Sequence, residues 1–130
     1  MKHLIAILLS AIPLHAAIHP EKWYQQGVAK ALQGKMEAPV ENGRVDVLTG
    51  THAIEVEFAA KWKNALGQSL WYALQTGKVA GIVLVIEDEK RDRGHLIRLG
   101  AVIEANKLPI RVWVWPDDFR EFEKHTEQLK

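Results

Sequence analysis

The sequence predicts an α/β domain with a mixed sheet, in the element order α-β-β-β-α-β-α-β plus a C-terminal helix. Three observations support this class. Short segments of alternating polar and apolar residues come early, an almost unbroken apolar segment lies in the middle, and stretches with helical spacing separate the later strands. The 130 residues are enough for one domain with a modest core and too few for two.

The first 17 residues are typical of a secretory signal peptide. Lys2 gives a basic start, residues 4–14 form an apolar run, and small residues allow cleavage after either Ala16 or Ala17. The run is shorter than the about 20 apolar residues that cross a membrane. We therefore expect removal of this segment rather than a permanent anchor.

Removal of residues 1–17 leaves a single domain of residues 18–130, and we predict that it is secreted or periplasmic, with no stable membrane span. The removed segment contains Lys2 and no acidic residue, so the formal net charge falls from +1 to zero. A neutral chain argues against a protein that holds DNA by bulk electrostatics. The absence of cysteine excludes disulfides, thiol chemistry and cysteine-ligated zinc.

The first half of the domain is predicted to be a helix followed by three antiparallel strands. Pro20 suits the first position of a helix, and Gly34 lies just beyond its end. Residues 41–43 and 49–51 are turn sequences that suit hairpin connections, which makes the three strands a meander. The predicted helix covers residues 20–32, and the predicted strands cover residues 35–40, 44–48 and 53–58.

The second half is predicted to alternate helices and strands. Residues 59–76 have helical apolar spacing, and Gly77 supplies the stop. Residues 79–86 are almost all apolar and rich in β-branched side chains, as expected of an internal strand that is buried on both faces. Asp117 and Asp118 suit the first turn of a last helix. The remaining elements are a helix at residues 94–106, a strand at residues 109–115, and the terminal helix through about residue 127.

Five tryptophans are expected to contribute much of the core. Trp113 and Trp115 alternate with valines, so both rings lie on one face of their strand. We expect core packing for this pair rather than stacking on nucleic acid bases. The other three, Trp23, Trp62 and Trp71, are also core candidates.

Glu55 and Glu57 are predicted to lie on one face of the third strand, because strand side chains alternate. Ile54 and Val56 then point to the opposite face. Two like charges this close are costly unless water or a cation compensates them. Mg²⁺ prefers one or two carboxylates together with waters and phosphate oxygens, so the pair indicates a metal site.

Three polar residues of the following helix share one stripe. Lys61, Gln68 and Tyr72 are spaced by 7 and 4 residues, and these steps return to nearly the same helical face. The stripe follows the carboxylate strand directly in the chain. Taken one at a time, these residues also fit the solvated side of an amphipathic helix, and the two glutamates also fit a solvent-facing strand.

Together, these residues resemble the PD-(D/E)XK nuclease superfamily. Its restriction-endonuclease-like fold also contains Holliday-junction resolvases and RecB-like exonucleases, and the resemblance covers most of the predicted domain. That superfamily has a metal-binding aspartate on its second strand and a (D/E)-x-K motif on its third. Asp46 matches the aspartate and Glu55 the acidic motif residue, whereas Glu57 stands where lysine is expected. Lys61 is placed like the lysine that some members carry on the following helix.

The same helix carries a second point of resemblance. Gln68 and Tyr72 are similar to the Gln-x-x-x-Tyr element of RecB-like nucleases, and Glu21 corresponds to an acidic residue that some resolvase-like members place on the first helix. The resemblance implies catalytic roles for Lys61 and Gln68 at the attacking water or the phosphate. It implies supporting roles for Tyr72 and Glu21.

The resemblance also implies metal-dependent hydrolysis of phosphodiester bonds. Asp46 and Glu55 would bind Mg²⁺ or Mn²⁺ together with the main-chain carbonyl of Val56. Glu57 would add a direct or water-mediated contact. Asp46 and Glu55 are thereby catalytic residues as well as metal ligands.

The predicted function is an exported nuclease that cuts DNA in preference to RNA. One alternative is a catalytically inactive binding module in the cell envelope that kept the fold, with Glu57 in place of the motif lysine as the sign of lost activity. Another is an export or envelope component with no link to nucleic acid. The sequence leaves open the choice between endonuclease and exonuclease, and whether the chain forms a homodimer.

Overall fold

The computed structural model describes residues 16–122 and 124 and shows a five-stranded mixed sheet with helices packed against it. The predicted α/β class and the predicted order of elements are confirmed. In chain order the elements, with 3-10 turns marked η, are α1 (Glu21–Leu32), β1 (Lys35–Val40), β2 (Gly43–Leu48), β3 (His52–Phe58), η1 (Ala59–Lys61), α2 (Trp62–Thr76), β4 (Val79–Val85), α3 (Glu89–Asn106), β5 (Ile110–Trp115) and η2 (Asp117–Phe119).

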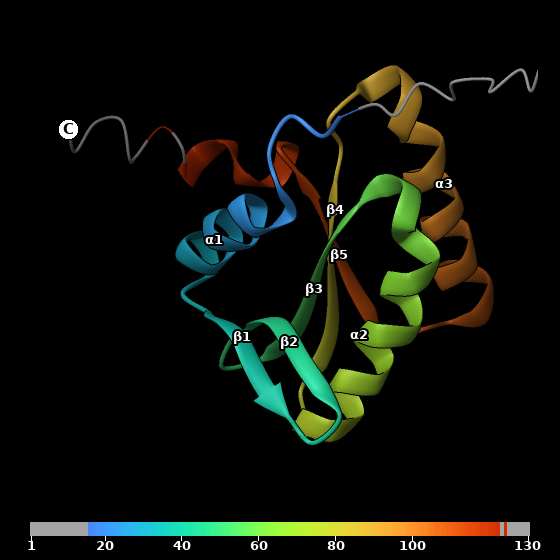
Figure 1. Ribbon diagram of the computed structural model, residues 1–130. Coiled ribbons are helices and arrows are strands. Elements are labelled where there is room, and N and C mark those ends of the chain that lie inside the picture. Colours follow the sequence, from blue (N-terminus) through green and yellow to red (C-terminus); the bar gives the residue numbers. More distant parts are fainter. Residues whose placement is uncertain (1–15, 123, 125–130) are drawn as a thin grey trace, which may run out of the picture.

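The strands lie in the order β1-β2-β3-β4-β5. As predicted, β1, β2 and β3 form an antiparallel meander, whereas β3, β4 and β5 are parallel and are connected by α2 and α3. Figure 1 shows α1 on one side of the sheet and α2 with α3 on the other. Every residue of β4 after Val79 is buried, which confirms an internal strand covered on both faces.

The ladder between β2 and β3 is short. It contains the pairs Val47–Ile54 and Leu48–Ala53, whereas β3 pairs with β4 along its whole length. The β1–β2 hairpin therefore diverges from the rest of the sheet beyond Ile54, and Figure 1 shows it projecting from the molecule below α1.

Three of the five tryptophans are buried as predicted. Trp113 and Trp115 belong to the core on the α1 side of the sheet, and Trp62 belongs to the core on the α2 side. The prediction was wrong for Trp23 and Trp71, which are 42% and 46% exposed. Successive helix residues point about 100° apart, and in each case the next residue, a tyrosine, takes the inward position.

The start of α3 was predicted too late in the chain. The helix begins at Glu89 rather than at residue 94, because the side chain of Asp88 accepts the N–H of Arg91 at 2.8 Å and caps the first turn. The carboxylate of Asp92 accepts two further N–H groups, from Glu87 and Asp88. The charged stretch is therefore the N-terminal end of the helix and not a loop in front of it.

Two terminal predictions fall largely outside the described residues. Residues 1–15 of the predicted signal peptide are not described, and Ala16 and Ala17 are exposed. The predicted terminal helix starts as η2 and continues with helical residues at 120–122 and 124, and residues 125–127 lie outside the described part. Among the described residues, no helix combines the length and the apolar character needed to cross a membrane.

The contact between the β1–β2 hairpin and α2 gives a first testable prediction. Gly43 has a φ of +145°, and a Cβ at this position would overlap the hydroxyl of Tyr72. We expect Gly43→Ala to lower the free energy of unfolding by about 1–3 kcal/mol, measured by chemical denaturation, because backbone strain and overlap add. Gly50→Ala is the matched control, since nothing lies within 4 Å of a Cβ there. Equal stability of the two variants would contradict the observed position of Tyr72.

Candidate functional site

Asp46 lies where β2 leaves β3. Beyond the last ladder pair, Oδ2 of Asp46 accepts the N–H of Val56 at 2.9 Å, so the carboxylate satisfies a backbone donor in the place of a strand partner. This bond holds the side chain of Asp46 against β3. The aspartate of the hairpin and the glutamates of β3 are thereby brought together.

Glu55 and Glu57 are buried, with exposed fractions of 3% and 8%. Their alternation places Ile54 and Val56 in the core on the α1 side, as predicted. Within the described part of the chain, Oε1 of Glu55 and Oε2 of Glu57 have no hydrogen-bond partner. Buried carboxylate oxygens of this kind are costly when charged, so the cluster favours either protonation or a bound cation. The idea of two solvent-facing glutamates is wrong.

The electrostatics of the three carboxyls follow from this burial. Burial raises the pKa of Glu55 to about 9, and the neighbouring charge of Asp46 raises it further. Burial also raises the pKa of Glu57 to about 7. Burial raises the pKa of Asp46 to about 6, although the bond from the Val56 N–H opposes this change. The carboxyls of Asp46 and Glu55 lie within hydrogen-bonding reach of each other, so the two groups titrate as a pair.

Two further charged residues border the cluster. The ammonium of Lys61, at the end of η1, lowers the pKa of Glu57, whereas the carboxylate of Glu21 raises it. Glu21 also raises the pKa of Asp46. The structure therefore brings Glu21, Asp46, Glu55, Glu57 and Lys61 together from α1, β2, β3 and η1.

The other two predicted site residues lie farther along α2. Tyr72 is half-buried and packs against Ala38, Val45 and Ala53, which fixes the β1–β2 hairpin to α2. Gln68 is exposed, and its side chain makes no hydrogen bond with any residue that the structure describes. Tyr72 thus has a packing role, and within the described chain no hydrogen bond joins Gln68 to the carboxylates.

Glu37 is a member of the acidic cluster that the sequence analysis missed. Its charge raises the pKa of Asp46, and its carboxylate lies 3.5 Å from the guanidinium of Arg44. The hairpin register carried the signal: Val40 pairs with Gly43, so counting back along both strands places Glu37 opposite Asp46. The predicted turn at residues 41–43 is one residue too long for this register and would place Glu37 opposite Val47, so the observed Val40–Gly43 pair was needed to find it.

The carboxylate oxygens of the cluster suit a metal ion that takes few ligands from the protein. Among residues 16–122 and 124, no group of three or more histidine, aspartate or glutamate side chains is arranged to hold a metal ion. The close carboxyls of Asp46 and Glu55 form a pair, and Glu55 has an oxygen without a partner. Mg²⁺ binds through one or two carboxylates and keeps several waters, so the pair fits such an ion.

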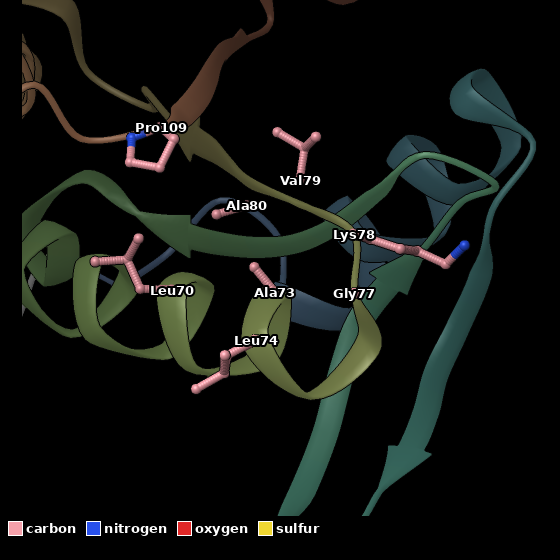
Figure 2. A pocket seen from close by; sticks show the side chains of 8 residues that line it. All are labelled: Leu70, Ala73, Leu74, Gly77, Lys78, Val79, Ala80 and Pro109. Carbon is pink, nitrogen blue, oxygen red and sulfur yellow. The ribbon is translucent and has the colours of Figure 1, made fainter.

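An apolar groove lies elsewhere on the molecule. It has a volume of about 450 Å³ and runs between the second half of α2 and the start of β4 (Figure 2). Its only charged lining residue in the described chain is Lys78, whose ammonium donates to the carbonyl of Gly50 at 2.9 Å. The groove has no carboxylate lining and offers no chemistry for phosphodiester hydrolysis.

Comparison with known proteins gave two relatives, both from Acanthamoeba polyphaga mimivirus. The chain is 42% identical over 64 residues to KilA-N domain-containing protein L32, which covers 49% of this chain and 17% of the relative. It is 34% identical over 67 residues to KilA-N domain-containing protein L33, which covers 52% of this chain and 27% of the relative. No family model matches the chain, and no solved structure gives a significant match. The similarity thus spans about half of this chain and less than a third of either viral protein.

Proposed function

We propose that this protein is a metal-dependent nuclease of the PD-(D/E)XK type, which hydrolyses phosphodiester bonds of DNA in preference to RNA. The observation that carries the proposal is the close pair formed by the half-buried Asp46 and the buried Glu55, in which one oxygen of Glu55 has no hydrogen-bond partner among the described residues. The observed element order supports it, as do the positions of Asp46 on β2, Glu55 on β3 and Lys61 at the start of the next helix.

During the proposed hydrolysis, a metal ion rather than a proton would compensate the negative charge of the Asp46–Glu55 pair. A bound Mg²⁺ or Mn²⁺ would supply Lewis acidity and would lower the pKa of a coordinated water. Asp46 and Glu55 would hold the ion, together with the main-chain carbonyl of Val56. Glu57 would contribute through water, because the described carboxylates do not form a three-residue metal group.

Lys61 is the residue best placed to meet the substrate. Its side chain is exposed, yet its charge acts on Glu57, so it borders the cluster and can still reach a phosphate oxygen. An ammonium there would orient the attacking water or neutralise the charge that develops on the phosphate. Gln68, one stripe position further along α2, would donate a hydrogen bond to the phosphate, and Tyr72 supports this face by packing.

Nucleic acid is the partner class proposed for this site. The phosphodiester backbone is anionic, and a protein of nearly zero net charge would rely on local contacts and on a bridging metal ion rather than on bulk attraction. The names of the two viral relatives, which refer to a KilA-N domain, are consistent with nucleic acid as the partner.

The decisive assay incubates the purified protein with plasmid DNA, linear DNA and RNA in Mg²⁺, in Mn²⁺ and in EDTA. We expect cleavage that requires the metal ion and disappears in Asp46→Asn. Glu104→Gln, which changes an exposed glutamate of α3, is the control for a generic loss of charge. Cleavage in EDTA, or undiminished cleavage by Asp46→Asn, would refute the assignment.

A second prediction concerns the helix-borne lysine. We expect Lys61→Ala to reduce metal-dependent cleavage by about 10–1000-fold, the range seen when one electrostatic stabiliser of a transition state is removed. Metal binding should be almost unchanged, because Lys61 is not a ligand. Lys63→Ala is the matched control, since Lys63 is exposed two residues away and lies 5.6 Å from the Trp62 ring centroid. Equal losses in both variants would remove Lys61 from the mechanism.

The inactive binding module is the second candidate, because Glu57 occupies the motif position of lysine and Gln68 makes no hydrogen bond to a carboxylate in the described part of the chain. Glu57→Lys separates the two proposals. If Lys61 already fills the role of the motif lysine, Glu57→Lys gains nothing in cleavage. If the lysine was lost together with activity, the wild-type protein binds DNA without cutting it, and Glu57→Lys creates cleavage.

A further inference from the structure

The segment in front of α1 donates hydrogen bonds to one carboxylate, that of Glu87. The N–H of Ile18 donates to Oε2 of Glu87 at 2.8 Å, and the hydroxyl of Tyr24 donates to the same oxygen at 2.6 Å. The N–H of His19 lies 3.4 Å from it. Since Glu87 lies between β4 and α3, these bonds join the N-terminal segment and α1 to the carboxyl end of the parallel strands.

The hydrogen-bond donors to the carboxylate of Glu87 are uncharged groups, namely two backbone N–H groups and the hydroxyl of Tyr24. Within the described residues, no salt bridge joins its carboxylate to a lysine, arginine or histidine side chain. Glu87, Arg91 and Ala17 line one hollow with a volume of about 280 Å³. The guanidinium of Arg91 pairs with Asp92 at 2.7 Å rather than with Glu87. Among the described residues, the carboxylate of Glu87 therefore lacks a directly bonded cation, and of its two backbone donors Ile18, at 2.8 Å, is closer than His19, at 3.4 Å.

We propose that the Ala17–Ile18 bond is the processing site of this protein, and that the new α-ammonium group of Ile18 forms an ion pair with Glu87. The sequence allows cleavage after Ala16 or after Ala17. Only cleavage after Ala17 places the positive charge on the atom that already contacts Glu87. Hydrolysis by a signal peptidase consumes one water and leaves a carboxylate on Ala17 and an ammonium on Ile18. A charge-assisted bond then replaces a neutral one.

The ion pair would fix the start of α1. Between Ile18 and the helix, the ring of His19 stacks on Trp23 with 3.8 Å between ring centroids. Glu21 follows as the first residue of α1 and borders the carboxylate cluster. Processing at Ile18 would therefore anchor the chain three residues before a member of the cluster. The inference rests on the predicted export and not on nuclease activity.

The first test determines where the processed chain begins. The full chain is expressed in a bacterium that exports it, and the intact mass of the exported protein is measured. We expect a chain that begins at Ile18. A product that begins at Ala17, or one that retains residues 1–17, would overturn the proposal.

The second test measures the ion pair itself. Melting temperatures are compared for the chain that begins at Ile18 and for the same chain with one extra alanine in front, each with Glu87 and with Glu87→Gln. We expect the extra alanine to lower the melting temperature by roughly 1–4 °C with Glu87 and to have no effect with Glu87→Gln. The comparison is made within each background, so the effect of Glu87→Gln on the bond from Tyr24 cancels. Equal melting temperatures with Glu87, or equal losses in both backgrounds, would refute the ion pair.

Discussion

Replacing Glu55 with glutamine is expected to abolish metal-dependent cleavage and, at the same time, to stabilise the metal-free protein. Cleavage should fall by at least about 100-fold, because the variant loses a negatively charged ligand of the proposed ion. Stability should rise, because burial raises the pKa of Glu55 to about 9 and glutamine removes the need to bury a charge or take up a proton. The gain at about pH 8 should be on the order of 1–3 kcal/mol in the free energy of unfolding.

The opposite signs of the two effects make this test specific. A variant that simply unfolds would lose cleavage and stability together, and a solvent-facing glutamate would affect neither. Denaturant unfolding in EDTA measures the stability, and cleavage of plasmid DNA in Mg²⁺ measures the activity. Glu104→Gln, which removes an exposed glutamate of α3, should change both by little. Glu55→Gln with lower stability in EDTA would contradict the proposed electrostatics.

The second large effect is the pH dependence of stability in the absence of metal. The pKa values of Asp46, Glu57 and Glu55 are raised in the folded protein to about 6, about 7 and about 9, chiefly by burial. Carboxyls with raised pKa values favour the folded state while they are protonated, so their contribution is complete below the unfolded pKa of about 4 and is lost as the pH rises. We therefore expect the melting temperature in EDTA to fall between about pH 5 and pH 8.

Mg²⁺ should reverse this loss. An ion that binds the deprotonated pair stabilises the folded state by about 2.7 kcal/mol at a concentration of 100 times its dissociation constant. The stabilisation should be large at about pH 8, should shrink towards pH 5, where protons compete for Asp46 and Glu55, and should disappear in Asp46→Asn. Melting curves with and without Mg²⁺ measure it. A metal effect that does not depend on pH or on Asp46 would place the ion elsewhere.

Much of the fold could be predicted because its signals are local. The turn sequences around Asn42 and Gly50 give the antiparallel meander, and the apolar run that became β4 gives an internal strand. Alternation along β3 gives the shared face of Glu55 and Glu57. Each of these depends on residues that are close in the chain, where backbone geometry alone sets the direction of the side chains.

The predictions that failed depend on competition between neighbours. Trp23 and Trp71 have suitable apolar character, yet the adjacent tyrosines occupy the inward positions of their helices. The early start of α3 depends on a cap by Asp88, in a stretch whose charges resemble those of a loop. Glu37 was overlooked because its partner in the cluster lies across a hairpin rather than along the same strand.

The sequence by itself determined the class of fold, the order of elements and the placement of Glu55 and Glu57 on one face, since periodicity and turn chemistry specify these features locally. The tertiary structure decided their environment. Only the packing of distant segments buries both carboxyls, closes the bond from Val56 to Asp46, and brings Ile18 to Glu87 across 69 positions of the chain. Burial and the proximity of charges are properties of the assembled sheet and helices. They shift the pKa values of the carboxyls, and no local sequence pattern encodes these shifts.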